Sequence, residues 1–188
     1  MKGKLVIISA PSGAGKTTIV KYLLGSGLNL TFSVSATTRR IRGNEINGKD
    51  YFFLSVREFR DKIGKGEFVE WEEVYKDHYY GTLKSEIKRI RDENKNVLFD
   101  VDVKGGINLK HIYGKDSISI FIMPPSITEL ENRLINRGTD SQEKIRMRIT
   151  KAQEEMKSAD KFDHIVINDN LEKAQTESYK LIYDFINK

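Results

Sequence analysis

The sequence of 188 residues has no cysteine, only three prolines and a single tryptophan. Without cysteine the chain has neither disulfides nor thiolate metal sites, and a cytoplasmic location fits this composition. No apolar run approaches the roughly 20 residues that a membrane-spanning helix needs. The chain passes from Met1 to Lys4 straight into its first apolar segment. We therefore expect no membrane association and no secretory signal.

The composition, 38% hydrophobic and 31% charged, is typical of a globular protein with one well-buried core. At this length we expect one compact domain that carries a small insertion or lid. The net charge of +5 is compatible with nucleic-acid binding and equally with an enzyme whose two substrates are polyanions. Because the arginines discussed below fall in short clusters, we favour the enzyme and expect no nucleic-acid partner.

Residues 5–18 combine a short β-branched run, a glycine-bearing turn and the start of a helical pattern. This order matches the P-loop pattern Gly-x-x-x-x-Gly-Lys-Ser/Thr, with Ala10 in the first position. Turn N–H groups and a helix N-terminus bind phosphate, while Lys16 would add charge and the Thr17 hydroxyl a magnesium ligand. A surface turn of small residues is the alternative, which the flanking strand and helix disfavour. The triphosphate site is expected at Ser12, Gly13, Ala14, Gly15, Lys16, Thr17 and Thr18.

The rest of the chain alternates apolar strands with amphipathic helices, which implies a parallel sheet covered on both faces. Residues 35–80 interrupt this alternation and resemble a small mixed β insertion, with residues 78–82 as an aromatic turn. Strands are predicted at 28–34, 50–53, 68–75, 96–103, 117–123 and 164–168. Helices are predicted at 55–63, 83–91, 126–136, 141–158 and 171–186.

Arginines recur after the predicted strands, and phosphoryl transfer depends on neutralising charge and on positioning. Arg39 and Arg42 form a candidate anion clamp. Arg133 and Arg137 are four residues apart, hence on one helix face that a mobile lid could bring over the phosphoryl group. A solvated helix surface is the alternative, and it is the one we favour for Arg146.

Three carboxylates stand in or beside apolar strands. Glu70 is either an exposed strand residue or a residue that recognises guanine. One carboxylate can accept hydrogen bonds from both the N1–H and the 2-amino group of guanine, whereas adenine lacks this pair of donors. A hydroxyl from Ser35 or Thr82 could donate to guanine O6. Asp100 and Asp102, two apart on one predicted strand, should both face the cleft at its carboxyl end. One would organise magnesium through water, and the other could reach the acceptor base.

Taken together, these motifs resemble guanylate kinases from the P-loop to the last helix. The resemblance implies a P-loop NTPase core with a small mixed β GMP-binding insertion and a helical lid. It places the core in residues 1–34, 83–125 and 159–188, the insertion in 35–82 and the lid in 126–158. The matching motifs, in the family's order, are residues 9–17, 35–39 with Arg42, 50–53, 68–70, 79–82, 100–102, 124–126, 137–139 and 167–169.

The resemblance also implies an activity, namely transfer of the γ-phosphoryl group of ATP to GMP, and to dGMP, with Mg²⁺. A monomer or homodimer is expected. In the family, matching residues hold the GMP phosphate (Arg39, Arg42, Tyr51, Tyr80) and read guanine (Ser35, Glu70, Thr82, Asp102). By the same resemblance, the residues that approach the ATP phosphates and the transferred group are Lys16, Arg133, Arg137 and Arg148. Asn168 would lie by the adenine. Magnesium would be held by Thr17, and by Asp100 through water.

Two alternatives compete with this interpretation. A P-loop kinase for another phosphorylated acceptor, such as a ribosyl bisphosphate, would need the arginines but not Glu70, Thr82 and Asp102. A non-catalytic interaction module of the same family would typically lack an intact P-loop, whereas Lys16 and Thr17 are present here.

Overall fold

The computed structural model describes residues 3–136, 138 and 141–188, and its centre is a five-stranded parallel sheet. The strand order is β2-β7-β1-β8-β9, so β1 lies in the middle and is buried on both faces. This sheet is the predicted parallel sheet. Its strands are β1 (Leu5–Ser9), β2 (Leu30–Phe32), β7 (Asn96–Asp100), β8 (Ser117–Met123) and β9 (His164–Ile167).

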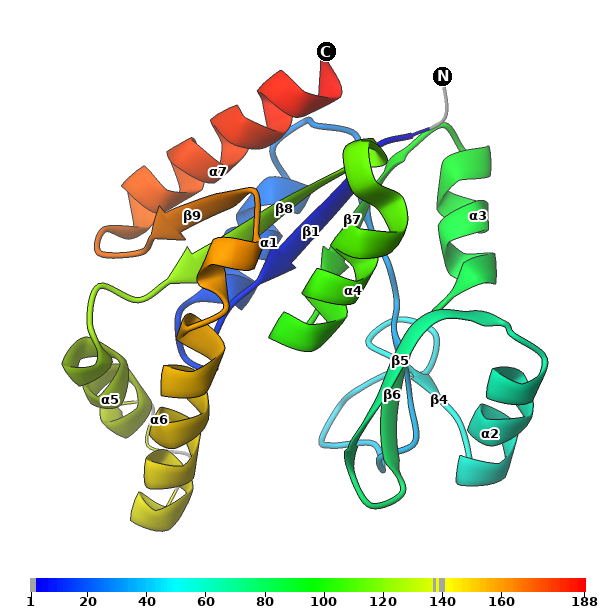
Figure 1. The fold of residues 1–188 in the computed structure, drawn as a ribbon, viewed down its shortest axis with the longest axis horizontal. Helices are drawn as coiled ribbons and strands as arrows, with labels where there is room; N and C mark the ends of the chain where they lie inside the picture. The colour runs from blue at the N-terminus through cyan, green and yellow to red at the C-terminus, as the bar shows by residue number, and fades with distance from the viewer. Residues whose placement is uncertain (1–2, 137, 139–140) are drawn as a thin grey trace.

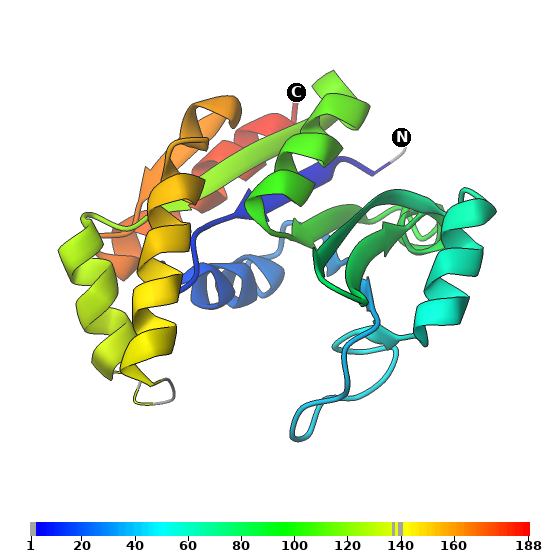
Figure 2. The same ribbon diagram turned by 60° about the horizontal axis from the view of Figure 1, so that its bottom comes forward.

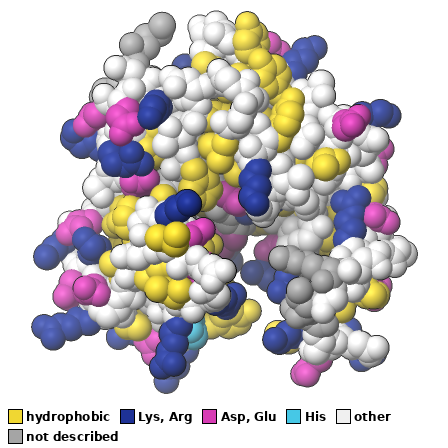
Figure 3. Space-filling view, turned by 180° about the vertical axis from the view of Figure 1, so that it is seen from behind, with side chains coloured by type: hydrophobic (Ala, Val, Ile, Leu, Met, Phe, Trp, Pro, Cys, Tyr) yellow, Lys and Arg dark blue, Asp and Glu magenta, His cyan; other side chains and the backbone are white. Residues whose placement is uncertain are grey.

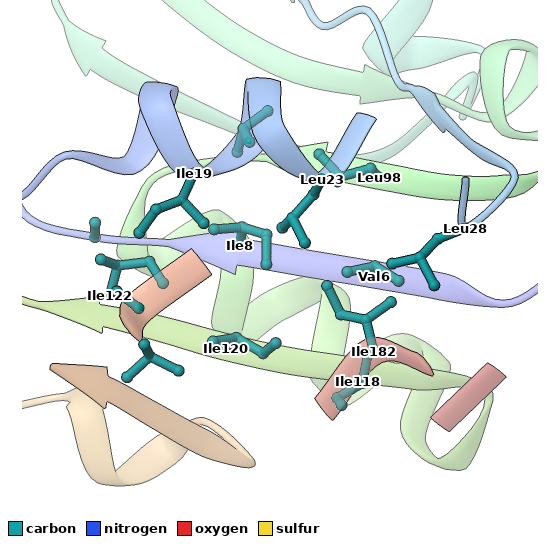
Figure 4. Packing of buried hydrophobic residues seen from close by; sticks show 14 of the residues in the cluster. Val6, Ile8, Ile19, Leu23, Leu28, Leu98, Ile118, Ile120, Ile122 and Ile182 are labelled. Atoms are coloured by element: carbon teal, nitrogen blue, oxygen red, sulfur yellow. The ribbon is translucent and has the colours of Figure 1, made fainter. Parts of the chain in front are cut away.

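Helices cover both faces of the parallel sheet, as Figure 1 shows. Because successive side chains of a strand point to opposite faces, β1 supplies both cores. Val6 and Ile8 pack against α1 (Lys16–Leu24) and α7 (Leu171–Ile186), as Figure 4 shows from close by. Leu5 and Ile7 pack on the other face against α3 (Lys84–Asp92) and α4 (Val103–Tyr113).

A second, mixed sheet forms a small lobe with α2 (Val56–Gly64), and its strand order is β4-β3-β6-β5. Ser55 begins α2 with the capping box that its sequence predicts: the Ser55 hydroxyl accepts the Glu58 amide, and the Glu58 carboxylate accepts the Ser55 amide. The strands of this small lobe are β3 (Ala36–Thr37), β4 (Phe52–Phe53), β5 (Phe68–Tyr75) and β6 (His78–Leu83).

A two-helix lobe, α5 (Ile127–Asn136) and α6 (Gln142–Met156), stands across from the small lobe (Figures 1 and 2). Leu130, Leu134, Ile145 and Ala152 form its buried core. Single 3₁₀ turns, η1 (Gly114–Asp116) and η2 (Ala159–Lys161), precede β8 and β9. None of the helices in the described part of the chain is long and apolar enough to cross a membrane.

Most predicted elements are present, and β5, β8 and α7 have the predicted bounds. The aromatic turn predicted at residues 78–82 is wrong, because these residues form β6, paired with β5. Tyrosines favour strands, and the chain reverses just before them. Asp77, with φ of 61°, adopts the left-handed conformation of that turn.

The strand predicted at residues 96–103 is also too long. β7 ends at Asp100, and Asp102 instead caps α4, a helix that the sequence analysis missed. Gly105 and Gly106 near its start lower the helix propensity. Gly106 is needed for packing, since a Cβ there would lie 3.0 Å from the Phe162 ring.

Candidate active site

A cleft of about 730 Å³ lies between the two lobes, over the carboxyl ends of β1 and β7. The space-filling view from behind shows this hollow between the lobes (Figure 3). Thirteen of the sequence-predicted site residues line it, namely Ser12, Gly13, Gly15, Lys16, Thr17, Thr18, Ser35, Tyr51, Glu70, Tyr80, Asp100, Asp102 and Arg133. Ala14, Arg39, Arg42, Thr82, Arg148 and Asn168 are not among the lining residues, and Arg137 lies outside the described residues.

The P-loop takes its shape from two glycines in the left-handed region, Gly13 with φ of 97° and Gly15 with φ of 92°. Other residues rarely adopt this conformation. Gly13 also makes room for the two-helix lobe, because a Cβ there would lie 3.0 Å from Leu130 and from Leu134. Gly15 is the N-cap of α1, so the positive end of this helix faces the cleft.

Lys16 lies on the floor of the cleft. Its Nζ donates to the carbonyl of Val101 over 2.8 Å and forms an ion pair with Asp100. Because β1 and β7 are neighbouring parallel strands, Asp100 lies beside the end of β1, where the P-loop begins. The lysine is thereby held within reach of a bound phosphate, and the exposed Thr17 follows it.

Two arginines of the two-helix lobe contact the P-loop or its support. Arg148 Nη1 donates to the Ser12 hydroxyl over 2.8 Å. Arg133 Nη2 donates to the Asn168 carbonyl over 3.0 Å, and its Nε donates to Glu129. The two-helix lobe that carries these arginines therefore contacts Ser12 of the P-loop and the Asn168 carbonyl.

Glu70 and Asp102 line the cleft, and the buried Thr82 lies behind Glu70. The Thr82 hydroxyl donates to Glu70 Oε1 over 2.7 Å, and the Gly105 amide donates to Asp102 Oδ1 over 2.8 Å. A Cβ on Gly105 would lie 3.3 Å from both carboxylates. Burial raises the pKa of Glu70, and the negative charge of Asp102 raises it further. A ligand that donates hydrogen bonds would stabilise the ionised pair.

Arg39 and Arg42, predicted as one clamp, differ in environment. Arg39 is buried, and its guanidinium lies 4.7 Å from the centre of the Tyr51 ring, whereas Arg42 is exposed. Tyr51 in turn packs edge-on against Tyr80 at 6.1 Å between ring centres. Burial raises the pKa of Tyr51, so its hydroxyl stays protonated and can donate to an anion.

Comparisons of the sequence and of the structure with known proteins agree with one another on the family. A family model described as guanylate kinase matches residues 2–184. The chain belongs to the guanylate kinase family. Guanylate kinase from Bacteroides thetaiotaomicron is 54% identical over all of this chain and 92% of its own length. Guanylate kinase from Porphyromonas gingivalis is 54% identical over 98% of this chain and 99% of its own.

A solved structure agrees with the family assignment. Guanylate kinase from Anaplasma phagocytophilum aligns with a TM-score of 0.80 and 27% identity, over 100% of this chain and 88% of that chain. The resemblance inferred from the motifs is thus confirmed at the level of family and fold. The two alternatives, another P-loop kinase and a non-catalytic module, are not favoured.

The guanylate kinase site also contains residues that the sequence analysis did not select. Lys151 and Glu155 of α6 line the cleft and form an ion pair at 3.5 Å. Glu45 binds both terminal nitrogens of Arg39. A carboxylate six residues after an arginine is only a weak indication in the sequence that the two form an ion pair, because a loop of that length can hold the two side chains together or apart.

Proposed function

We propose that this guanylate kinase transfers the γ-phosphoryl group of ATP to GMP, giving ADP and GDP. The observation that carries the proposal is that Glu70, which accepts from Thr82, and Asp102 line the same cleft as an intact P-loop. Guanine offers this cluster two adjacent donors, whereas adenine would leave the half-buried carboxylate of Glu70 without a donor from the base.

The donor half of the site is the P-loop. Its turn and the N-terminus of α1 would hold the ATP phosphates, with Lys16 as the point charge. Asn168 would lie by the adenine. Arg133, Arg137 and Arg148 would neutralise the charge on the transferred group. Because transfer proceeds by positioning and charge neutralisation, no covalent enzyme intermediate is required.

The cleft floor fits Mg²⁺, which prefers oxygen ligands and takes many of them from substrate phosphates and water. Thr17 and Asp100 supply such oxygens and both line the cleft. Among the described residues, no group of three or more acidic or histidine side chains could hold a metal by itself. Thr17 would bind the ion directly and Asp100 through water. The bound ion would neutralise negative charge on the phosphates.

The acceptor half of the site is the small lobe. Arg39, Arg42, Tyr51 and Tyr80 would hold the GMP phosphate. Ser35, Glu70, Thr82 and Asp102 would read the base. We propose dGMP as a second acceptor, because none of these eight groups is assigned to the ribose 2′-hydroxyl.

The proposed units are a core of residues 1–34, 83–125 and 159–188, a GMP-binding insertion of 35–82 and a lid of 126–158. Closure of the insertion and the lid would exclude water, which otherwise competes as the acceptor. A cytoplasmic location and a monomeric or homodimeric state complete the proposal.

The proposal is tested by coupled measurement of ADP formation with GMP, dGMP, AMP, IMP and a ribosyl bisphosphate as acceptors. We expect the highest kcat/KM with GMP. A higher kcat/KM with AMP or with the bisphosphate would overturn the proposed acceptor.

A further inference from the structure

Glu45 is tied to both arginines of the phosphate clamp. Its carboxylate accepts hydrogen bonds from Nη1 and Nη2 of Arg39, each over 2.6 Å. Glu45 Oε2 also accepts the backbone amide of Arg42 over 2.8 Å. One carboxylate thus closes the loop and links the buried side chain of Arg39 to the backbone of the exposed Arg42.

The Arg39 guanidinium contacts two aromatic rings as well as Glu45. Its Cζ lies 4.7 Å from the centre of the Tyr51 ring and 5.5 Å from the centre of the Phe53 ring. A second Nη1 contact reaches the carbonyl of Arg40 over 3.0 Å. Arg39 is only 8% exposed, and a charge this buried depends on a paired partner. Glu45 is that partner.

The remaining donors of Arg39 form a second edge. A guanidinium has five N–H donors, of which Glu45 and the Arg40 carbonyl take three. The donor on Nε and one donor on Nη2 have no carboxylate or carbonyl partner among the described residues. Two parallel donors of this kind suit a phosphate. Glu45 therefore holds Arg39 by one edge, and the other edge, which has no carboxylate or carbonyl partner in the described part of the chain, lies within hydrogen-bonding reach of the Tyr51 hydroxyl, a proposed ligand of the same phosphate.

We propose that Glu45 is a positioning residue for the acceptor phosphate, acting through Arg39 and through the backbone of Arg42. The inference rests on the proposed function, since it takes the acceptor phosphate as the ligand of the clamp. The opposite role is that Glu45 competes with the phosphate for Arg39. The second edge of Arg39, which Glu45 does not occupy, and the bond to the Arg42 amide favour positioning, because the phosphate need not displace Glu45.

Glu45 stays ionised under all assay conditions. Its hydrogen bonds from Arg39 and from the Arg42 amide lower its pKa to about 2. A variant that removes the charge is therefore informative at any pH from 6 to 9.

The test is Glu45→Gln, which keeps the size of the side chain and loses its charge. We expect the KM for GMP to rise roughly 10-fold, the scale of a lost charge-assisted hydrogen bond, with kcat and the KM for ATP within about 2-fold of wild type. Guanosine lacks the phosphate, so its inhibition constant against GMP should not change. Glu45→Asp, which keeps the charge, should recover part of the loss. Glu177→Gln, on the exposed face of α7, is the matched control.

A double-mutant cycle with Arg39→Lys separates positioning from a general effect on folding. If Glu45 acts mainly through Arg39, Glu45→Gln costs much less in the Arg39→Lys background than in wild type. A lower KM for GMP in Glu45→Gln would establish competition and overturn the proposal. Equal losses for GMP and guanosine, or full additivity in the cycle, would also overturn it. The wild-type acceptor panel reports separately on the proposed function.

Discussion

Asn168 Nδ2 donates a hydrogen bond to the carbonyl of Ala14 over 2.7 Å, joining the end of β9 to the P-loop. Asn168 is buried, and its Nδ2 lies 2.4 Å from the position that a Cβ on Gly15 would occupy. The amide thus fills the space beside the P-loop that the glycine leaves open. This contact indicates that Asn168 maintains the shape of the loop, besides its proposed place by the adenine.

Asn168→Ala should destabilise the protein and weaken ATP binding. The Ala14 carbonyl loses its partner in a buried position, which costs about 1–3 kcal/mol of unfolding free energy. Urea denaturation and the KM for ATP are the measurements. Asn132→Ala, on an exposed position of α5, is the control and should stay within about 0.5 kcal/mol. Equal stability of the two variants would contradict a structural role for the Asn168 amide.

Glu86→Ala should cost much more stability than Glu93→Ala, although both carboxylates bind Arg89. Glu86 is 4% exposed and also accepts the Val34 amide, next to the site residue Ser35. Its loss leaves that buried donor unpaired, at about 1–3 kcal/mol, whereas the exposed Glu93 pair contributes about 0–1 kcal/mol. Urea midpoints compare the two variants. A larger loss in Glu93→Ala would be incompatible with this account.

The raised pKa of Glu70 predicts that the ionised Glu70 carboxylate lowers the unfolding free energy of the ligand-free protein, and that this effect depends on pH. A carboxyl whose pKa is higher in the folded than in the unfolded state stabilises the fold below its unfolded pKa, and this contribution is lost as pH rises through the folded pKa. Glu70→Gln removes the effect. The unfolding free energy of wild type relative to Glu70→Gln should therefore fall as pH rises above 4.5. A difference that does not change with pH would show that Glu70 is not destabilised by burial.

Gly105→Ala should impair GMP use without unfolding the protein. The added Cβ would lie 3.3 Å from Glu70 Oε2 and from Asp102 Oδ1, so one carboxylate must move by a few tenths of an ångström. Alanine also favours the helix by about 1 kcal/mol. We expect a lower kcat/KM for GMP at unchanged or higher thermal stability. Gly64→Ala, with open space around it, is the control. An unchanged kcat/KM for GMP would contradict the claim that a side chain at position 105 disturbs the carboxylates that bind the base.

The features that the sequence predicted are those encoded locally. The P-loop, the alternation of strands and helices and the capping box at Ser55 each depend on residues within a few positions of one another. The β5–β6 hairpin was only half predicted, because the signal from its tyrosines was assigned to a turn instead of a strand.

The features that the sequence could not predict depend on long-range contacts or on loop geometry. The partner of Asn168 lies 154 residues away. The N-cap role of Asp102 did have a local signal, since aspartate is a favoured N-cap residue, but the apolar run that continues to Val103 and the glycines at 105 and 106 outweighed it. Arg39 and Arg42 look equivalent in sequence, and only the packing of Tyr51 and Phe53 makes Arg39 the buried one.

The central claim is that the half-buried carboxylate of Glu70 binds guanine. It is tested most directly by kcat/KM for GMP and for IMP in wild type and in Glu70→Gln. IMP keeps N1–H and lacks the 2-amino group, so wild type should prefer GMP. In Glu70→Gln we expect kcat/KM for GMP to fall by about 1–3 kcal/mol and the preference over IMP to shrink. An unchanged ratio of GMP to IMP in Glu70→Gln would contradict the account.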